Sequence, residues 1–146
     1  MRGSQKSIIL VARQLGVHIG PNDIPERFQI DDRELKTSEM CELAQSFNLK
    51  AKATKLSESE LLKLLTKKQQ ILRLKNGRYI IALRVITNEN NEKSVLCLDT
   101  GVSSPKPQQI NIKELAKGWK GEAILLKAKL KKFEEDSELK IGWLLG

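Results

Sequence analysis

The sequence predicts an α+β fold built on an antiparallel sheet. Helical periodicity dominates the first part of the chain, and three consecutive strand-like segments follow between residues 69 and 99. The first two are separated by Asn76-Gly77, a strong hairpin signal because both residues tolerate the positive φ of a type I′ turn. Helices that precede a run of strands favour a layered arrangement, and we expect them to pack mainly on one face of the sheet.

Composition indicates a single globular domain. The 146 residues are 40% hydrophobic and 30% charged, which is ordinary for a chain with a real core. No run of 18 apolar residues occurs, so no membrane span is predicted. Two cysteines, Cys41 and Cys97, and one histidine, His18, give neither a disulfide framework nor metal-ligand spacing. We expect no metal or cofactor, and the chain has no glycine-rich phosphate loop for ATP.

The formal net charge is +8, which would suit nucleic acid or an anionic surface. The lysines are scattered along the chain, however, and aromatic residues make up only 4% of it. Few aromatics leave little for base stacking, and no helix-turn-helix or zinc-finger pattern occurs. We therefore expect no nucleic-acid partner.

The first helix is predicted over residues 5–15, with Gly16 suited to the position after its end. Residues 1–4, Met-Arg-Gly-Ser, look like an expression-vector leader and are left out of the predicted fold. The helix has one apolar face, formed by Ile8, Val11, Ala12 and Leu15.

Two further helices follow before the sheet. After a short helical segment between Pro21 and Phe28, Thr37 or Ser38 is predicted to cap a helix that ends at Phe47. Its buried stripe comprises Met40, Leu43, Ala44 and Phe47. A short strand is predicted over residues 50–55. Ser57 and Glu60 then form a capping box, which predicts a helix over residues 58–66.

A two-residue turn at Asn76-Gly77 would pair Leu74 with Tyr79, and Leu72 with Ile81. Opposed residues share a face, so we expect the helices over residues 5–15 and 37–47 to pack on one apolar face. That face comprises Leu72, Leu74, Tyr79, Ile81, Leu83 and Val85.

The next connection would place Tyr79 opposite Asp99 and Ile81 opposite Cys97, so Asp99 would end its strand on the core side. An unpaired buried carboxylate is costly. Asp99 is therefore either the residue that opens the Asp99-Thr100-Gly101 turn or the remnant of a site.

The rest of the chain is predicted to complete the domain at residue 130. A proline-containing loop over 101–109, a helical turn over 112–117 and a strand over 122–130 come in that order. Residues 131–146 are highly charged and end in Trp143-Leu144-Leu145-Gly146. We interpret them as a linker toward a membrane domain.

The pattern ILRLKNGRYIIALRVI followed by VLCLDT resembles the double-glycine leader peptidase family, cysteine-peptidase family thirty-nine. The runs IILVARQLGVHIGPNDIPERF and FEEDSELKIGWLLG resemble that family's first helix and the segment that leads into an exporter's membrane helix. The resemblance implies a papain-like domain at the N-terminus of a bacterial ABC exporter, over residues 5–130.

The resemblance also implies a degenerate catalytic site. The family's catalytic Cys position falls near Gly3 and its catalytic His position holds Tyr79, while its Asp is kept as Asp99. Tyr79 cannot act as the base at neutral pH because a tyrosine pKa is near 10, and His18 has no matched cysteine. We therefore expect no catalysis.

Two functions remain open from the sequence. The first is a non-catalytic domain that docks an unfolded secreted polypeptide, such as a toxin or adhesin, for its ABC transporter. Substrate contacts would then come from Tyr79, Asp99 and Arg73, at the cytoplasmic face of the bacterial inner membrane. The alternative is an active double-glycine leader peptidase domain that lacks its catalytic Cys through truncation. Partners implied by the resemblance are the membrane and nucleotide-binding domains.

Overall fold

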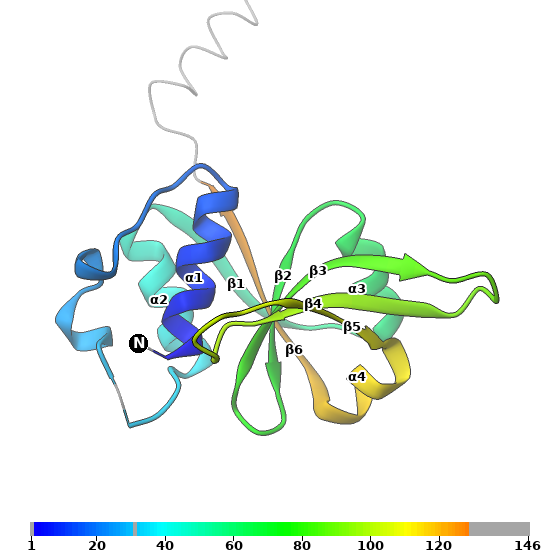
Figure 1. Ribbon diagram of the computed structural model, residues 1–146. Coiled ribbons are helices and arrows are strands. Elements are labelled where there is room, and N and C mark those ends of the chain that lie inside the picture. Colours follow the sequence, from blue (N-terminus) through cyan, green and yellow to red (C-terminus); the bar gives the residue numbers. More distant parts are fainter. Residues whose placement is uncertain (1, 31, 129–146) are drawn as a thin grey trace, which may run out of the picture.

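The computed structural model describes residues 2–30 and 32–128 (Figure 1). Its α-helices are α1 (Gly3–Gln14), α2 (Thr37–Ser46), α3 (Glu58–Leu65) and α4 (Ile112–Gly118). Two short 3-10 helices lie between α1 and α2, at Pro21–Asp23 and Glu26–Phe28. The strands are β1 (Leu49–Lys55), β2 (Gln70–Leu74), β3 (Tyr79–Thr87), β4 (Lys93–Asp99), β5 (Pro107–Asn111) and β6 (Trp119–Ala128).

The six strands form one antiparallel sheet in the order β1-β6-β2-β3-β4-β5. The last strand, β6, therefore lies between β1 and β2. Strand β5 overlaps the end of the predicted loop over 101–109 and was not predicted. It begins at Pro107 and lies at the sheet edge, where a residue without an N–H donor is tolerated.

Helices cover both faces of the sheet. Figure 1 shows α1 and α2 on one side of it and α3 and α4 on the other. The α+β class and the antiparallel sheet are confirmed, but the helices are divided more evenly between the faces than we predicted. Each face has its own buried cluster, one including Ile8, Leu43, Ile71, Tyr79 and Ile81, the other including Leu61, Leu72, Ile80, Cys97 and Trp119.

The β2–β3 hairpin differs from the prediction by one residue. Arg73 pairs with Tyr79 and Ile71 with Ile81, because Gly77 alone takes positive φ (86°) and the turn holds one extra residue. The Gly77 N–H donates to the Leu74 carbonyl at 2.9 Å. The predicted single apolar face is therefore wrong. The α1 side carries Tyr79, Ile81 and Leu83, whereas the α3 side carries Leu72, Leu74 and Val85.

The pairing of β3 with β4 is shifted in the same way. Asp99 lies opposite Ile80, and Cys97 lies opposite Ala82, so the predicted partners Tyr79 and Ile81 were wrong. Because paired residues share a face, this register puts Asp99 on the side of Ile80 rather than that of Tyr79.

The predicted N-terminal caps of the helices were confirmed at one helix and wrong at another. The capping box at α3 is confirmed, since Ser57 Oγ accepts the Glu60 N–H at 3.2 Å and Glu60 Oε1 accepts the Ser57 N–H at 3.0 Å. The predicted cap of α2 was wrong: Lys36 is the N-cap residue, and its N–H donates to Glu39 Oε1 at 2.8 Å. Helix α1 begins at Gly3, so leaving Gly3 and Ser4 out of the fold was also wrong.

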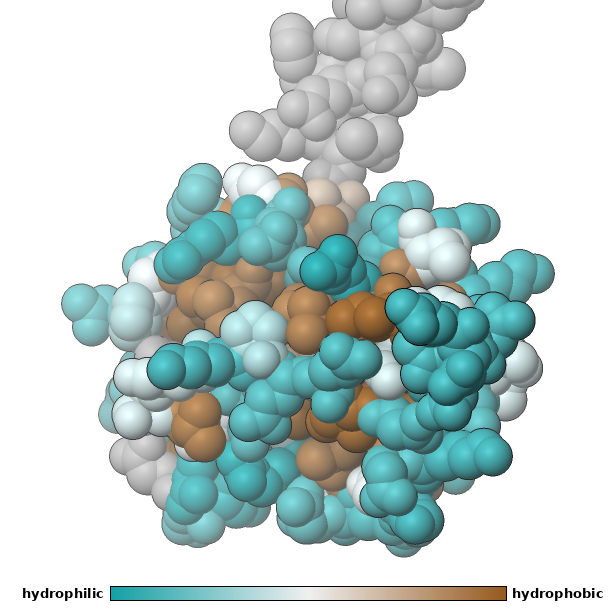
Figure 2. All heavy atoms as spheres, turned by 45° about the vertical axis from the view of Figure 1, so that its right-hand side comes forward, coloured by the Kyte–Doolittle hydropathy of each residue, from teal (hydrophilic) through white to brown (hydrophobic). Residues whose placement is uncertain are grey.

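On the face seen in Figure 2, hydrophobic residues form separate areas among hydrophilic ones. Within residues 2–30 and 32–128, no helix has the length and apolar character that a membrane crossing requires. The predicted linker over 131–146 lies outside the described residues.

Candidate functional site

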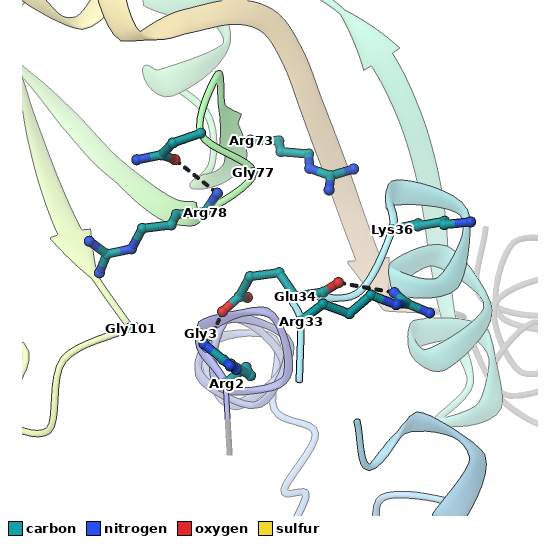
Figure 3. A pocket seen from close by; sticks show the side chains of 10 residues that line it. Arg2, Gly3, Arg33, Glu34, Lys36, Arg73, Gly77, Arg78 and Gly101 are labelled. Carbon is teal, nitrogen blue, oxygen red and sulfur yellow. Dashed lines mark hydrogen bonds between the residues drawn. The ribbon is translucent and has the colours of Figure 1, made fainter. Parts of the chain in front are cut away.

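A cleft of about 750 Å³ opens where the start of α1 meets the loop before α2 and the β2–β3 turn (Figure 3). It therefore gathers segments from three separate parts of the sequence, and Gly101, after β4, closes one side. Its lining residues are Arg2, Gly3, Arg33, Glu34, Lys36, Arg73, Asn76, Gly77, Arg78 and Gly101.

The Glu34 carboxylate binds the N-terminus of α1 within this cleft. The Gly3 N–H donates to Glu34 Oε1 at 3.2 Å, and the Ser4 N–H donates to Glu34 Oε2 at 2.7 Å. The first N–H groups of a helix have no partner inside the helix, and its dipole favours an anion there. Ser4 Oγ also accepts the Leu35 N–H at 3.2 Å, which fixes the loop before α2 against the helix.

Gly3, the position that the resemblance assigns to the nucleophile, is packed tightly. A Cβ atom at Gly3 would lie 3.0 Å from the Gly101 nitrogen and 3.1 Å from Thr100 Oγ1. Any side chain there would require the Thr100-Gly101 backbone to move.

Thr100 holds this contact together, although no local pattern marks it as a site residue. Its side chain is fully buried, and its hydroxyl donates to the Gly3 carbonyl oxygen at 2.9 Å. A second hydrogen bond of 2.8 Å joins the hydroxyls of Thr100 and Ser7. The start of α1 is thereby fixed to the end of β4.

Tyr79, at the position of the family's His, is a core residue. It is 1% exposed, and its hydroxyl donates to the Leu35 carbonyl oxygen at 2.7 Å. Burial raises the pKa of Tyr79 to about 12. The Arg73 guanidinium lies over the Tyr79 ring, 5.3 Å from its centroid. Tyr79 thus lies beneath Arg73, which itself lines the cleft.

Asp99 is not among the lining residues, but it bonds Arg78, which is one of them. Arg78 Nη2 donates to the two carboxylate oxygens at 2.8 and 2.9 Å. Asp99 Oδ1 also accepts the Gly101 N–H at 2.9 Å, so Asp99 does open the Asp99-Thr100-Gly101 turn. Its carboxylate therefore orients the Arg78 guanidinium.

Of the predicted site residues, Gly3 and Arg73 line the cleft. Tyr79 lies beneath the Arg73 guanidinium, and Asp99 is bonded to the lining residue Arg78. Four charged lining residues were not predicted: Arg33, Glu34, Lys36 and Arg78. No local pattern marks them, because their proximity depends on how distant segments pack.

None of the described residues that line the cleft carries a thiol or an imidazole. His18 is exposed and follows the C-terminal end of α1, whereas Gly3 begins that helix. Cys97 is buried, which raises its pKa to about 12, and partial burial also raises the pKa of Cys41. Both thiols are therefore mainly protonated at neutral pH, and a protonated thiol is a weaker nucleophile than a thiolate.

The fold and the cleft belong to a chain whose sequence is similar to a known family. The sequence model of the peptidase C39 family matches residues 6–131. The chain belongs to the peptidase C39 family. A comparison with curated proteins gave no match.

Solved peptidase C39 domains share the fold. A double glycine motif protease from an AMS/PCAT transporter, in complex with its leader peptide, superimposes with a TM-score of 0.70 at 11% identity, over 88% of this chain and 85% of that one. The peptidase C39 like domain of a Vibrio parahaemolyticus toxin secretion ATP-binding protein gives 0.63 at 23%, over 88% and 98%. The peptidase domain of Streptococcus ComA, a bi-functional ABC transporter in quorum sensing, gives 0.67 at 17%, over 84% and 88%.

Proposed function

We propose that this peptidase C39 domain is non-catalytic and that it docks an unfolded polypeptide for an ABC exporter. The observation that carries the proposal is the chemistry of the described residues that line the cleft, none of which has a thiol or an imidazole. Gly3 carries no side chain at the nucleophile position that the resemblance assigns, and a Cβ there would press against Gly101 at 3.0 Å. Tyr79 is buried at the base position that the resemblance assigns. Cysteine peptidases require a thiolate and a base in hydrogen-bonding reach, and this cleft offers neither.

The cleft remains suited to binding. It is open, polar and formed by rigid elements, since α1 is fixed by Glu34 and Thr100. An extended chain can lay its unpaired backbone donors and acceptors along such a surface, whereas a folded protein has already paired its own. Docking therefore favours the unfolded form.

The related domains support a place within an exporter. One is solved with a leader peptide, and another belongs to a toxin secretion ATP-binding protein. We extend this by analogy to the present chain, with an exported polypeptide as its substrate and the other transporter domains as its partners. In that setting the domain acts at the cytoplasmic face of the inner membrane, and Arg73, Asp99 and the Arg78 that Asp99 holds contact the substrate.

An active leader peptidase is the alternative, and membership of a peptidase family favours it. The two functions are separated by incubating the chain with a double-glycine leader peptide under reducing conditions and following the products by mass spectrometry. We expect no cleavage. Time-dependent cleavage after the Gly-Gly pair that iodoacetamide abolishes would establish a peptidase instead.

Docking is tested with one polypeptide in two states of equal charge. α-Lactalbumin that has been reduced and alkylated with iodoacetamide stays unfolded without gaining charge, and the native protein is its folded control. Binding is followed by amide shifts of the ¹⁵N-labelled domain. We expect shifts only with the unfolded form, whereas equal binding of both forms, or none of either, would contradict docking of unfolded chains.

A further inference from the structure

The cleft gathers far more positive than negative charge. Five cationic residues from three segments line it, against Glu34 as the one carboxylate among the lining residues. The cationic residues are Arg2, Arg33, Lys36, Arg73 and Arg78. A concave surface of one sign focuses the electrostatic field and concentrates ligands of opposite charge.

Arg33 and Arg78 have carboxylate partners outside the lining. Arg33 pairs with Glu39 at 2.8 Å, and Arg78 pairs with Asp99 at 2.8 Å. The Arg78–Asp99 pair uses only Nη2 of the guanidinium, and the Arg78 side chain remains 46% exposed. Arg78 therefore keeps donors that can reach a further anion at the cleft.

Arg73 and Lys36 are different, because neither has a carboxylate within ion-pair distance among residues 2–30 and 32–128. Arg73 is half-buried over Tyr79, and its only described side-chain hydrogen bond is a long one of 3.4 Å to the Thr37 hydroxyl. A partly desolvated guanidinium gains more from an added carboxylate than a fully hydrated one does.

Glu34 shows that the cleft already accommodates a carboxylate. In Figure 3 it lies between Gly3 and the β2–β3 hairpin, from which Arg73 and Arg78 leave in opposite directions. It is held by the two N–H groups at the start of α1. Its negative charge offsets part of the positive field that an incoming anion would experience.

We propose that this cleft binds carboxylate side chains of an extended acidic polypeptide, with Glu34 as an intramolecular competitor for the same positive field. Arg73 and Lys36 receive carboxylates on one side of the hairpin, and Arg78, held by Asp99, receives them on the other. This proposal rests on the proposed docking function and adds the chemistry of the substrate segment.

The test compares two fluorescein-labelled peptides of the same length and the same apolar positions. One carries Glu and Asp at the remaining positions and the other carries Gln and Asn. Binding is measured by fluorescence anisotropy at physiological salt, where screening acts beyond about 8 Å. We expect the acidic peptide to bind roughly tenfold more tightly, which corresponds to one or two charge contacts.

Local and diffuse charge effects are separated by matched variants. Lys36→Gln/Arg73→Gln should abolish most of the preference, whereas Lys63→Gln/Lys93→Gln removes the same charge from exposed sites elsewhere and should change it less than about twofold. Glu34→Gln should strengthen binding of the acidic peptide about threefold or more, while Glu58→Gln, at the start of α3, should not. Circular dichroism of the Glu34→Gln variant checks that the domain remains folded.

Each remaining outcome decides one question. Equal binding of the two peptides would overturn the acidic-segment proposal but leave docking intact. Equal effects of the cleft and remote variants would also overturn it, because the preference would then come from the overall charge of +8. Tighter binding of duplex DNA than of the acidic peptide would assign the cleft to nucleic acid. Failure of both peptides and of unfolded α-lactalbumin would overturn docking itself.

Discussion

The hydroxyl of Tyr79 donates a 2.7 Å hydrogen bond to the carbonyl oxygen of Leu35, and both residues are buried. This bond joins β3 to the loop that carries Glu34 and Lys36. Tyr79 is therefore a structural link that holds one wall of the cleft.

Tyr79→Phe should lower the free energy of unfolding by about 1–3 kcal/mol, because the buried Leu35 carbonyl loses its side-chain donor. Urea unfolding followed by circular dichroism measures the change. Tyr79→Leu should cost more, since it also removes the ring beneath Arg73. A Phe variant as stable as the wild type would show that water replaces the hydroxyl at no cost.

Restoring the family's catalytic residue types should not restore activity. We expect Gly3→Cys/Tyr79→His to leave a double-glycine leader peptide intact, because a Cβ at Gly3 meets the Gly101 backbone at 3.0 Å. Position 79 also points into the core rather than the cleft. Mass spectrometry of the peptide checks this, with circular dichroism to confirm folding. Cleavage by the folded double variant would mean that the catalytic geometry survives.

Ile81→Ala should destabilise the domain by about 2–5 kcal/mol, since a large side chain is removed from a well-packed site. Ile81 is 1% exposed and lies in the cluster between the sheet and α1. Val102→Ala is the matched control, because Val102 is 42% exposed and its truncation should cost less than about 0.5 kcal/mol. Chemical unfolding of both variants makes the comparison.

The Arg33–Glu39 pair should make stability depend on acid pH. Hydrogen bonds from the Arg33 side chain and then from the Lys36 N–H lower the pKa of Glu39 from 4.5 to about 2. A carboxyl with a lower pKa in the folded state stabilises the fold above its unfolded pKa, and this contribution is lost as pH falls. The wild type should therefore exceed Glu39→Gln in free energy of unfolding at pH values above 4.5. This difference should shrink as the pH falls from 4.5 to 2.

Urea unfolding at several pH values measures that gap. Arg33→Gln supplies the control, because it removes the same interaction from the other side. The double variant Arg33→Gln/Glu39→Gln should be about as stable as either single variant if the pair is the source. A gap of constant size across the acid range would contradict the assignment.

The two thiols should react in a fixed order. Cys41 is partly exposed, whereas burial raises the pKa of Cys97 to about 12. Alkylation requires an accessible thiolate, so iodoacetamide should modify Cys41 first and reach Cys97 only in denaturant. The Cys41→Ser variant isolates the second thiol. Rapid labelling of that variant in native buffer would show that β4 opens readily.

Sequence patterns predicted the elements better than their pairing. The helix at residues 58–65 was predicted well because Ser57 and Glu60 satisfy each other's backbone N–H groups within four residues. The hairpin register failed because Asn-Gly is compatible with both a two-residue and a three-residue loop. Gly77 alone took positive φ, and one extra residue moved Leu72 and Leu74 to the opposite face.

The cleft was only partly predictable for a related reason. The resemblance indicated Gly3, Tyr79 and Asp99, but the charges around them come from segments with no distinctive local pattern. Glu34 lies in an irregular loop, and only the packing of that loop against α1 reveals its role. Thr100 was likewise missed, since its hydroxyl has a partner only when residues 3 and 100 are adjacent.

Strand β6 pairs with both β1 and β2, which are separated from each other in the sheet. During synthesis, β1 leaves the ribosome long before its neighbour β6 exists, and β6 is its hydrogen-bonding partner among the described strands. The edge of β1 that pairs with β6 therefore stays unpaired and accessible to other chains until Trp119–Ala128 has been synthesised. Among the described strands, the sheet is closed by the one that is synthesised last.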